Sequence, residues 1–325
     1  MGLRLMTAVA ILGAIVVAGL TTIAVFRSDQ MRLSLAELRE MYATPQSQFV
    51  DIAGMSVHYM DEGEGDPIVL IHGSEGTLHT WDGVVAGLKD RYRMIRMELP
   101  GRGLTEAAGP NDVAEDVTLH GMIMELLDHV GVEGPFHLIG QSSGGTIATR
   151  VAASYPDRVS KLVVMNMPSA PVSVPRSARP PEVRRAMMLN DDLLKFRTWG
   201  FWETYYTYLW GQPERLGDDL ITMMYDQNRR VRGPLARPLI PANFSPDQAN
   251  RNLGGVTTPT LVIWAMSDPV LPPQQLEELT SRMTQAPKTI HELPLTGHFP
   301  SLEAPDLILP PIAKFLAEGP ESGFE

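Results

Sequence analysis

The stretch FHLIGQSSGG, residues 136–145, decides the fold. Its first four residues form an apolar run that predicts a short buried strand, and the residues after it have helical spacing. Between strand and helix stands a G-x-S-x-G pattern, which is typical of a sharp turn that presents a serine hydroxyl clear of the backbone. The residues two before and two after that serine must be small, so that strand and helix can pass closely. Ser142 meets this requirement, whereas Ser143 does not, because Gln141 stands two residues before it.

Apolar runs bounded by Gly or Pro alternate with helical stretches on both sides of this turn. Strand–helix–strand crossovers produce such an alternation, so we predict an α/β fold with a mostly parallel, doubly wound sheet and helices on both faces. The first two expected strands flank Ala53-Gly54 and have the pattern of a hairpin. The expected strands are Phe49–Ile52, Met55–Tyr59, Ile68–Ile71, Tyr92–Leu99, Phe136–Ile139, Lys161–Met165, Thr260–Trp264 and Thr289–Leu293, and the expected helices are 114–130, 144–155, 273–285 and 303–317.

One insert, residues 168–250, interrupts this alternation. It begins rich in proline and continues with helical sequence in which eight of the fifteen residues from Phe196 to Trp210 are aromatic. This pattern predicts a helical cap over a pocket. We expect cap aromatics to bind an apolar or aromatic substrate, although packing of the cap onto the core explains them equally well. The candidates are Trp199, Phe201, Trp202, Tyr205, Tyr206 and Trp210.

Two further residues complete a candidate catalytic group with Ser142. A serine hydroxyl is a weak nucleophile without a base, and the base needs an acid that orients it. His298 lies in a Gly-flanked loop after the last expected strand, and Asp268 follows the strand Thr260–Trp264. Both positions fall at the carboxyl edge of the sheet, where open α/β sheets place their sites. We therefore predict Ser142, Asp268 and His298 as catalytic nucleophile, acid and base.

Two backbone amides are candidates for an oxyanion hole. The amide of Ser143 follows the nucleophile at the start of a helix and points toward a developing oxyanion. The second donor should come from the loop after the strand Ile68–Ile71, where the amide of Ser74 is the candidate. We interpret His72, in the same loop, as structural.

Together these residues resemble the α/β-hydrolase fold family over about residues 47–317. The resemblance implies an eight-stranded sheet whose core comprises residues 47–167 and 251–319, with the cap at 168–250 inserted after the sixth strand. Haloalkane dehalogenases and epoxide hydrolases of this family use Asp at the turn, so Ser142 argues against both activities. The motifs that carry the resemblance are His72-Gly73, Leu99-Pro100-Gly101-Arg102-Gly103, the turn around Ser142, the segment Trp264–Asp268 and Gly297-His298.

The amino terminus has the character of a membrane segment. Met6 to Phe26 is a run of 21 uncharged residues, which as a helix reaches the thickness of a hydrocarbon core. We expect residues 1–27 to form an uncleaved signal anchor, because no A-x-A cleavage site ends the run. A cleaved signal peptide is the alternative. Residues 28–46 are expected to be a linker with a short amphipathic helix. The large acidic body favours a periplasmic or otherwise extracytoplasmic catalytic domain.

Composition limits the partners. The 325 residues carry a formal charge of −11, and an acidic body is repelled by phosphate backbones, so we expect no nucleic acid partner. Cysteine is absent, which excludes disulfides, thiolate nucleophiles and Cys-ligated zinc. We also expect no metal and no organic cofactor, because the sequence shows neither ligand spacing for a metal nor a Gly-rich phosphate loop.

These observations predict a membrane-anchored serine hydrolase that cleaves a carboxylic ester or lactone of an apolar small molecule through an acyl-enzyme. Two other activities of the resembling family keep the same three residues: carbon–carbon bond hydrolysis of ring-cleavage products and cofactor-free haloperoxidase or perhydrolase chemistry. A binding protein on a hydrolase scaffold is the alternative without catalysis, although a pure binder would not need His298.

Overall fold

A computed structural model describes residues 2–74, 76–106, 117–230 and 245–318. Its centre is an eight-stranded sheet with the strand order β1-β2-β4-β3-β5-β6-β7-β8. β2 runs antiparallel to β1 and β4, and all other neighbours are parallel. This confirms the predicted fold class. The strands are β1 Gln48–Ile52, β2 Met55–Glu62, β3 Asp66–Ile71, β4 Tyr92–Met97, β5 Phe136–Gln141, β6 Val159–Met165, β7 Thr260–Ala265 and β8 Lys288–Leu293.

Helices cover both faces of the sheet because apolar side chains point to both sides of each central strand. In β3, Val69 and Ile71 pack with one set of helices, whereas Ile68 and Leu70 pack with the other. The first set contains α4 Leu119–His129, α5 Ser143–Ser154, α10 Pro246–Gly255 and α11 Gln274–Arg282, and the second contains α3 Asp82–Leu88 and α13 Pro305–Ala317. The sequence did not predict α3. It placed the last helix at 303–317, where the structure has a short α12 (Pro300–Glu303) and then α13.

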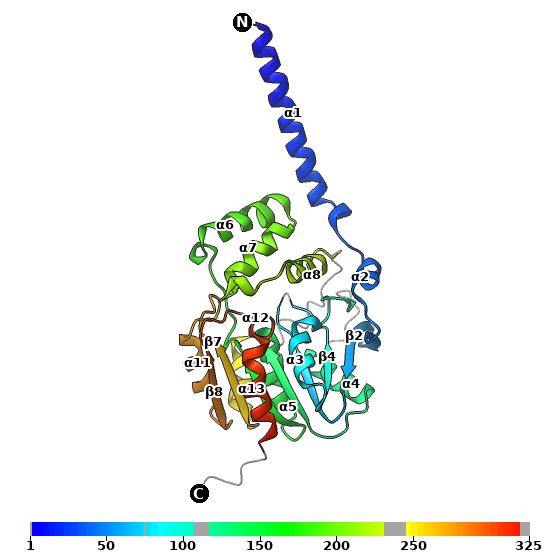
Figure 1. Ribbon diagram of the computed structural model, residues 1–325, viewed down its shortest axis with the longest axis vertical. Coiled ribbons are helices and arrows are strands. Elements are labelled where there is room, and N and C mark those ends of the chain that lie inside the picture. Colours follow the sequence, from blue (N-terminus) through cyan, green and yellow to red (C-terminus); the bar gives the residue numbers. More distant parts are fainter. Residues whose placement is uncertain (1, 75, 107–116, 231–244, 319–325) are drawn as a thin grey trace.

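The described residues of the insert 168–250 form helices and turns above the carboxyl edge of the sheet (Figure 1). They form α6 Pro181–Met187, a π-helical turn Met188–Leu194, α7 Trp199–Leu209 and α8 Asp218–Asn228. Side chains of α6, α7 and α8 pack in one hydrophobic cluster, which also includes Phe299. The boundary expected at residue 250 falls inside α10. Leu253 of that helix packs in the main core, so α10 belongs with the sheet and not with the cap.

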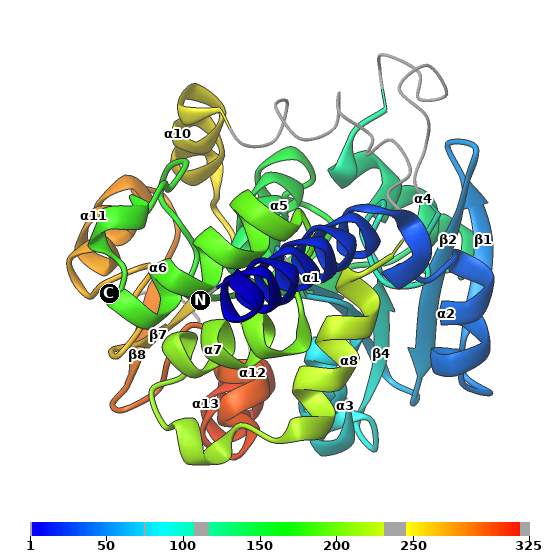
Figure 2. The same cartoon turned by 90° about the horizontal axis from the view of Figure 1, so that it is seen from above.

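The apolar amino-terminal run forms one helix, α1 Gly2–Arg27, which projects from the body on the side of the cap (Figures 1 and 2). By length and composition, Met6–Arg27 is long enough and apolar enough to cross a membrane, and its apolar stretch is exposed. The linker contains the expected short helix, α2 Leu35–Tyr42. A capping box between Ser34 and Glu37 fixes its start, and Leu38 is fully buried.

Candidate active site

The turn between β5 and α5 holds Ser142 in a strained conformation. Its φ of 53° and ψ of −129° lie in a region that side chains rarely adopt, and such strain concentrates at functional sites. The two flanking glycines make the turn possible. A Cβ atom on Gly140 would lie 2.6 Å from the carbonyl oxygen of Gly144, and one on Gly144 would lie 2.2 Å from that of Ile71. Small residues are therefore required at both positions, as the sequence pattern predicts.

The fold brings the three predicted residues together, although they come from three separate loops. His298 lies between β8 and α12, and its Nε2 is 3.1 Å from Ser142 Oγ. Asp268 follows β7, and its Oδ2 is 2.7 Å from His298 Nδ1. With the proton on Nδ1 donated to Asp268, Nε2 is left as an acceptor for the serine hydroxyl. All three side chains are buried, which strengthens the electrostatic interaction between them.

Asp268 is held by donors that the sequence analysis did not include. Its Oδ1 accepts hydrogen bonds from the amides of Val270 and Leu271 at 2.7 and 3.0 Å. Its Oδ2 also accepts one from Asn166 Nδ2 at 2.8 Å. Asn166 is fully buried at the carboxyl end of β6 and has a φ of 38°. Its position directly after a strand next to β7 was the available signal, but an Asn after a strand does not by itself indicate a contact with Asp268.

The loop that carries His298 is tied to the cap. Glu303, buried in α12, accepts hydrogen bonds from the amides of Gly297 at 2.8 Å and Gln212 at 2.7 Å. The amide of His298 itself donates to the carbonyl oxygen of Leu209, the last residue of α7. The histidine is therefore positioned partly by the cap and not by the sheet alone.

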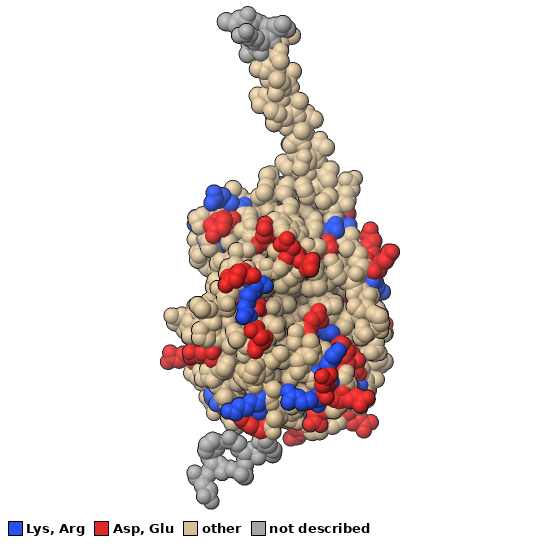
Figure 3. Space-filling view, in the orientation of Figure 1, with Lys and Arg blue, Asp and Glu red and all other residues tan. Residues whose placement is uncertain are grey.

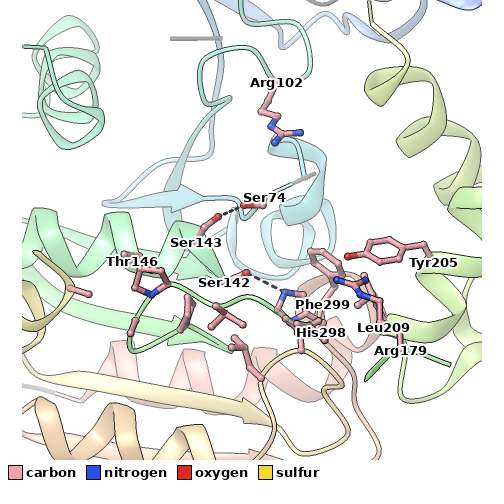
Figure 4. A pocket seen from close by; sticks show the side chains of 18 residues that line it. Ser74, Arg102, Ser142, Ser143, Thr146, Arg179, Tyr205, Leu209, His298 and Phe299 are labelled. Carbon is pink, nitrogen blue, oxygen red and sulfur yellow. Dashed lines mark hydrogen bonds between the residues drawn. The ribbon is translucent and has the colours of Figure 1, made fainter. Parts of the chain in front are cut away.

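The two predicted oxyanion residues lie side by side. The hydroxyl oxygens of Ser74 and Ser143 are 2.9 Å apart (Figure 4). Ser143 is the first residue of α5, where unpaired amides and the helix dipole favour negative charge. The loop before Ser74 runs close to the turn, because a Cβ on Gly73 would lie 2.9 Å from Ser142 Cβ.

His72 fixes that loop, in agreement with its interpretation as structural. Its Nδ1 donates to the carbonyl oxygen of Gly73 at 2.8 Å, and its Nε2 accepts from the amide of Leu99 at 3.1 Å. This pattern requires a neutral imidazole. Complete burial disfavours the charged form and lowers the pKa of His72 to about 4, so the ring is neutral at pH 7.

A cavity of about 490 Å³ opens over Ser142, His298, Ser74 and Ser143. The cap and its connections supply most of the far wall, which is largely apolar (Figure 4). The other lining residues are Arg102, Thr146, Pro168, Ala170, Pro171, Val172, Val174, Arg179, Tyr205, Leu209, Ala249, Val270, Leu271 and Phe299. Within the described ranges, His, Asp and Glu side chains form no group of three that could hold a metal ion.

Of the six cap aromatics expected to bind substrate, one lines the described cavity. Tyr205 lines the cavity, as expected. The other five pack within the cap and against Phe299, because one helix can turn only part of its surface toward the pocket. These five are Trp199, Phe201, Trp202, Tyr206 and Trp210.

Comparison with known proteins agrees with the fold. A family model described as alpha/beta hydrolase fold matches residues 66–305. Haloalkane dehalogenase 2 of Mycobacterium tuberculosis is 27% identical over 280 residues, 81% of this chain and 92% of that protein. The pimeloyl-[acyl-carrier protein] methyl ester esterase of Nitrosomonas europaea is 26% identical over 260 residues, 77% and 96% of the two chains. The structure of a membrane phospholipase A superposes with a TM-score of 0.62 at 19% identity, covering 97% and 96%.

The chain therefore belongs to the alpha/beta hydrolase fold family. The coarse part of the functional prediction, a hydrolytic enzyme that acts on a small molecule, follows from this membership.

Proposed function

We propose that the protein is a serine hydrolase that cleaves carboxylic esters or lactones through an acyl-enzyme. The observation that carries this proposal is the continuous hydrogen-bonded chain from Ser142 through His298 to Asp268, with distances of 3.1 and 2.7 Å, at the floor of a cavity. A buried histidine that joins a serine to a carboxylate is the arrangement that activates a serine hydroxyl.

The reaction proceeds in two halves. Ser142 Oγ attacks the substrate carbonyl carbon while His298 Nε2 takes the hydroxyl proton. The tetrahedral intermediate then expels the alcohol, which receives that proton from His298. In the second half, His298 removes a proton from water, the resulting hydroxide attacks the acyl-enzyme, and Ser142 leaves with the proton returned by His298. Asp268 stabilises the imidazolium formed in each half without itself taking the proton.

The amides of Ser143 and Ser74 are the proposed donors to the oxyanion. Each is near Ser142, and each belongs to a segment fixed by other contacts: α5 for Ser143, and the His72 hydrogen bonds for the loop of Ser74. Preorganised donors of this kind are each worth about 3 kcal/mol of transition-state stabilisation.

Ser142 also separates this proposal from one activity named among the relatives. The haloalkane dehalogenases that this family contains use Asp at the turn, and the position is serine here. The relative from Nitrosomonas europaea is by name a methyl ester esterase, which supports ester chemistry. Carbon–carbon bond hydrolysis and perhydrolase chemistry use the same three residues and become the alternatives if no ester is cleaved.

We further propose that α1 anchors the enzyme in a membrane with the cap facing the bilayer. Figure 3 shows the coloured part of this helix above the body in tan, without acidic or basic side chains, and the helix ends at Arg27 where it meets the body. Its end is fastened to the cap: Arg27 Nε donates to the carbonyl oxygen of Leu193, and the ring of Phe26 lies 5.5 Å from that of Phe196. Next to this junction Met188, Leu189 and Leu193 are exposed.

The linker holds this arrangement by further contacts with the cap. The amide of Leu33 donates to the carbonyl oxygen of Arg229 at 3.1 Å, and Arg229 Nη1 donates to that of Met31 at 3.2 Å. Tyr42 donates its hydroxyl proton to Asp226 Oδ2 at 2.6 Å. An apolar surface beside an anchoring helix is suited to contact lipid, and α1 and the cap are joined on the same side of the molecule (Figures 1 and 2).

The direct test is hydrolysis of 4-nitrophenyl esters from acetate to decanoate by the full chain in detergent micelles. Ser142→Ala should lower kcat by about 10³-fold or more while the protein stays folded. Ser281→Ala, which removes an exposed hydroxyl of α11, is the matched control and should keep wild-type activity. Equal activity of wild type and Ser142→Ala would refute the proposal. A fluorophosphonate probe, which labels activated serines, gives an independent readout.

A further inference from the structure

The proposed active-site cavity is positively charged although the chain is acidic. Its described lining contains two arginines, Arg102 and Arg179, and no Asp or Glu, whereas the chain as a whole carries a formal charge of −11. Figure 4 shows Arg102 pointing toward the serines from one side and Arg179 on the other side, near Tyr205 and His298. Arg102 has a cap partner, since its Nη1 donates to Asn228 Oδ1 at 3.5 Å.

Arg179 differs from two other arginines that are largely removed from solvent. Arg96 is paired with the carboxylates of Glu62 and Asp82, and Arg93 with that of Asp61. By contrast, no carboxylate among the described residues forms an ion pair with Arg179. Its Nε and Nη1 are both buried and have no hydrogen-bond partner in the described part of the chain. A buried donor without an acceptor is unfavourable, and a buried charge without one is more so.

The local structure holds this guanidinium at the cavity. Arg179 follows a short 3-10 turn, Arg176–Ala178, and its amide donates to the carbonyl oxygen of Arg176 at 3.2 Å. Its Cζ lies 5.5 Å from the centroid of the Tyr205 ring, a cation–π contact that orients the group without satisfying its N–H donors. The group is therefore positioned and partly desolvated, and its two buried nitrogens lack an acceptor among the residues described.

We propose that Arg179 binds a carboxylate of the substrate, so that the enzyme prefers esters that carry a second, anionic end. This inference rests on the proposed ester hydrolysis and specifies its substrate class. The guanidinium presents parallel N–H donors that match the two oxygens of a carboxylate, and the charge-assisted pair would satisfy the buried nitrogens. Arg102 adds positive potential to the same cavity. The apolar remainder of the lining suits a hydrocarbon spacer between the ester and the carboxylate.

The test compares matched substrates on the full chain. For the acyl side, the mono-4-nitrophenyl esters of adipate, suberate and sebacate are paired with 4-nitrophenyl hexanoate, octanoate and decanoate. For the alcohol side, 4-acetoxybenzoate is paired with 4-acetoxybenzamide. The measured quantity is the ratio of kcat/KM for the anionic ester to that for its neutral partner. The variants are Arg179→Met, Arg179→Lys and, as the control that removes one exposed charge of α6, Arg185→Met.

For wild type we expect the ratio to exceed one on at least one side of the ester, and that side identifies where the carboxylate is carried. Arg179→Met should lower the ratio about 10-fold or more, as loss of a charge-assisted hydrogen bond requires, with the neutral esters changed less than about twofold. Arg179→Lys should recover part of it, and Arg185→Met should leave it unchanged. An equal fall for neutral and anionic esters would show a merely structural role and overturn the inference.

Failure of the inference is distinguishable from failure of the proposed function. Turnover of neutral esters with an unchanged ratio in Arg179→Met overturns only the carboxylate site. If no ester is turned over, calorimetric binding of monomethyl suberate to Ser142→Ala still decides: the inference requires that binding weaken about 10-fold when Arg179→Met is added, and equal binding to both proteins overturns it.

Discussion

The Glu303 carboxylate accepts a hydrogen bond at 2.8 Å from the amide of Gly297, the residue before His298. The same carboxylate accepts hydrogen bonds from the amides of Gly211 and Gln212, just after α7, at 3.2 and 2.7 Å. One buried acidic side chain thus joins the loop of the proposed base to the cap. Movement of the cap and the position of the base are mechanically linked through this contact.

Glu303→Gln tests that link. The side chain keeps its size but loses one of two acceptor oxygens, so one of the three amides is left unpaired and the loop is held less firmly. We expect kcat to fall about 10-fold and the free energy of unfolding to fall by about 1–3 kcal/mol, from ester kinetics and urea titration. Glu277→Gln, an exposed position on α11, is the matched control. Unchanged kcat in Glu303→Gln would contradict the proposed positioning.

Asn166→Asp tests the side-chain amide that donates to Asp268 Oδ2, the same oxygen that accepts from His298. The substitution keeps the shape but places two carboxylates about as close as the present 2.8 Å contact, where both cannot stay ionised. We expect kcat/KM to fall more than 10-fold in ester kinetics. Wild-type kcat/KM in this variant would contradict the role of Asn166 in holding Asp268.

The same variant makes a second prediction about pH. Two adjacent like charges disfavour each other, so the folded variant should keep a proton that the unfolded chain has already released, and its loss of stability relative to wild type should grow as pH rises. Thermal unfolding should therefore separate Asn166→Asp from wild type more at pH 8 than at pH 5. A separation that is larger at pH 5 would refute the assignment.

His72 predicts an acid limit to stability. Burial lowers its pKa from 6.5 to about 4 in the folded protein, so the unfolded chain binds the proton first. Stability is full above about pH 6.5 and falls as pH decreases toward 4, by on the order of 3 kcal/mol from this group. His72→Gln, which does not titrate, should unfold with a shallower pH dependence in calorimetry between pH 7.5 and 4.5. An identical slope in variant and wild type would show that other groups cause the effect.

The absence of cysteine allows a direct test of the membrane-facing cap. Single cysteines at Met188 or Leu193, both exposed beside α1, can carry a polarity-sensitive fluorophore in the full chain. We expect the fluorophore on the protein in lipid nanodiscs to emit at shorter wavelength than the fluorophore on the same protein in detergent micelles. Glu133→Cys, exposed next to the amino-terminal end of β5 and so opposite the cap, is the control and should not shift. Recovery of the protein in nanodiscs without any shift at Met188→Cys would leave the anchor intact and refute the cap contact.

Local sequence patterns were enough to predict the fold class, the turn that carries Ser142 and the amino-terminal helix. The G-x-S-x-G turn depends on residues within five positions of each other, and strand–helix alternation is a local property of each segment, so both were predictable from the chain. Asp268 and His298 were predictable because parallel strands bring their carboxyl ends to one edge. The length and apolar character of α1 were equally plain from the sequence.

Tertiary structure decided what surrounds those residues. Asn166 lies 102 residues from Asp268, to which it donates a hydrogen bond, and Glu303 lies 6 residues from Gly297, from which it accepts one. No sequence pattern predicts either contact. Six aromatic residues of the cap look alike in sequence, but packing turns Tyr205 toward the cavity and the others into the cap. Nothing in the sequence distinguishes Arg179 from the other arginines. In the fold its Nε and Nη1 are buried and have no hydrogen-bond partner among the described residues. Burial and partnership belong to the assembled molecule, because they depend on which distant segments meet.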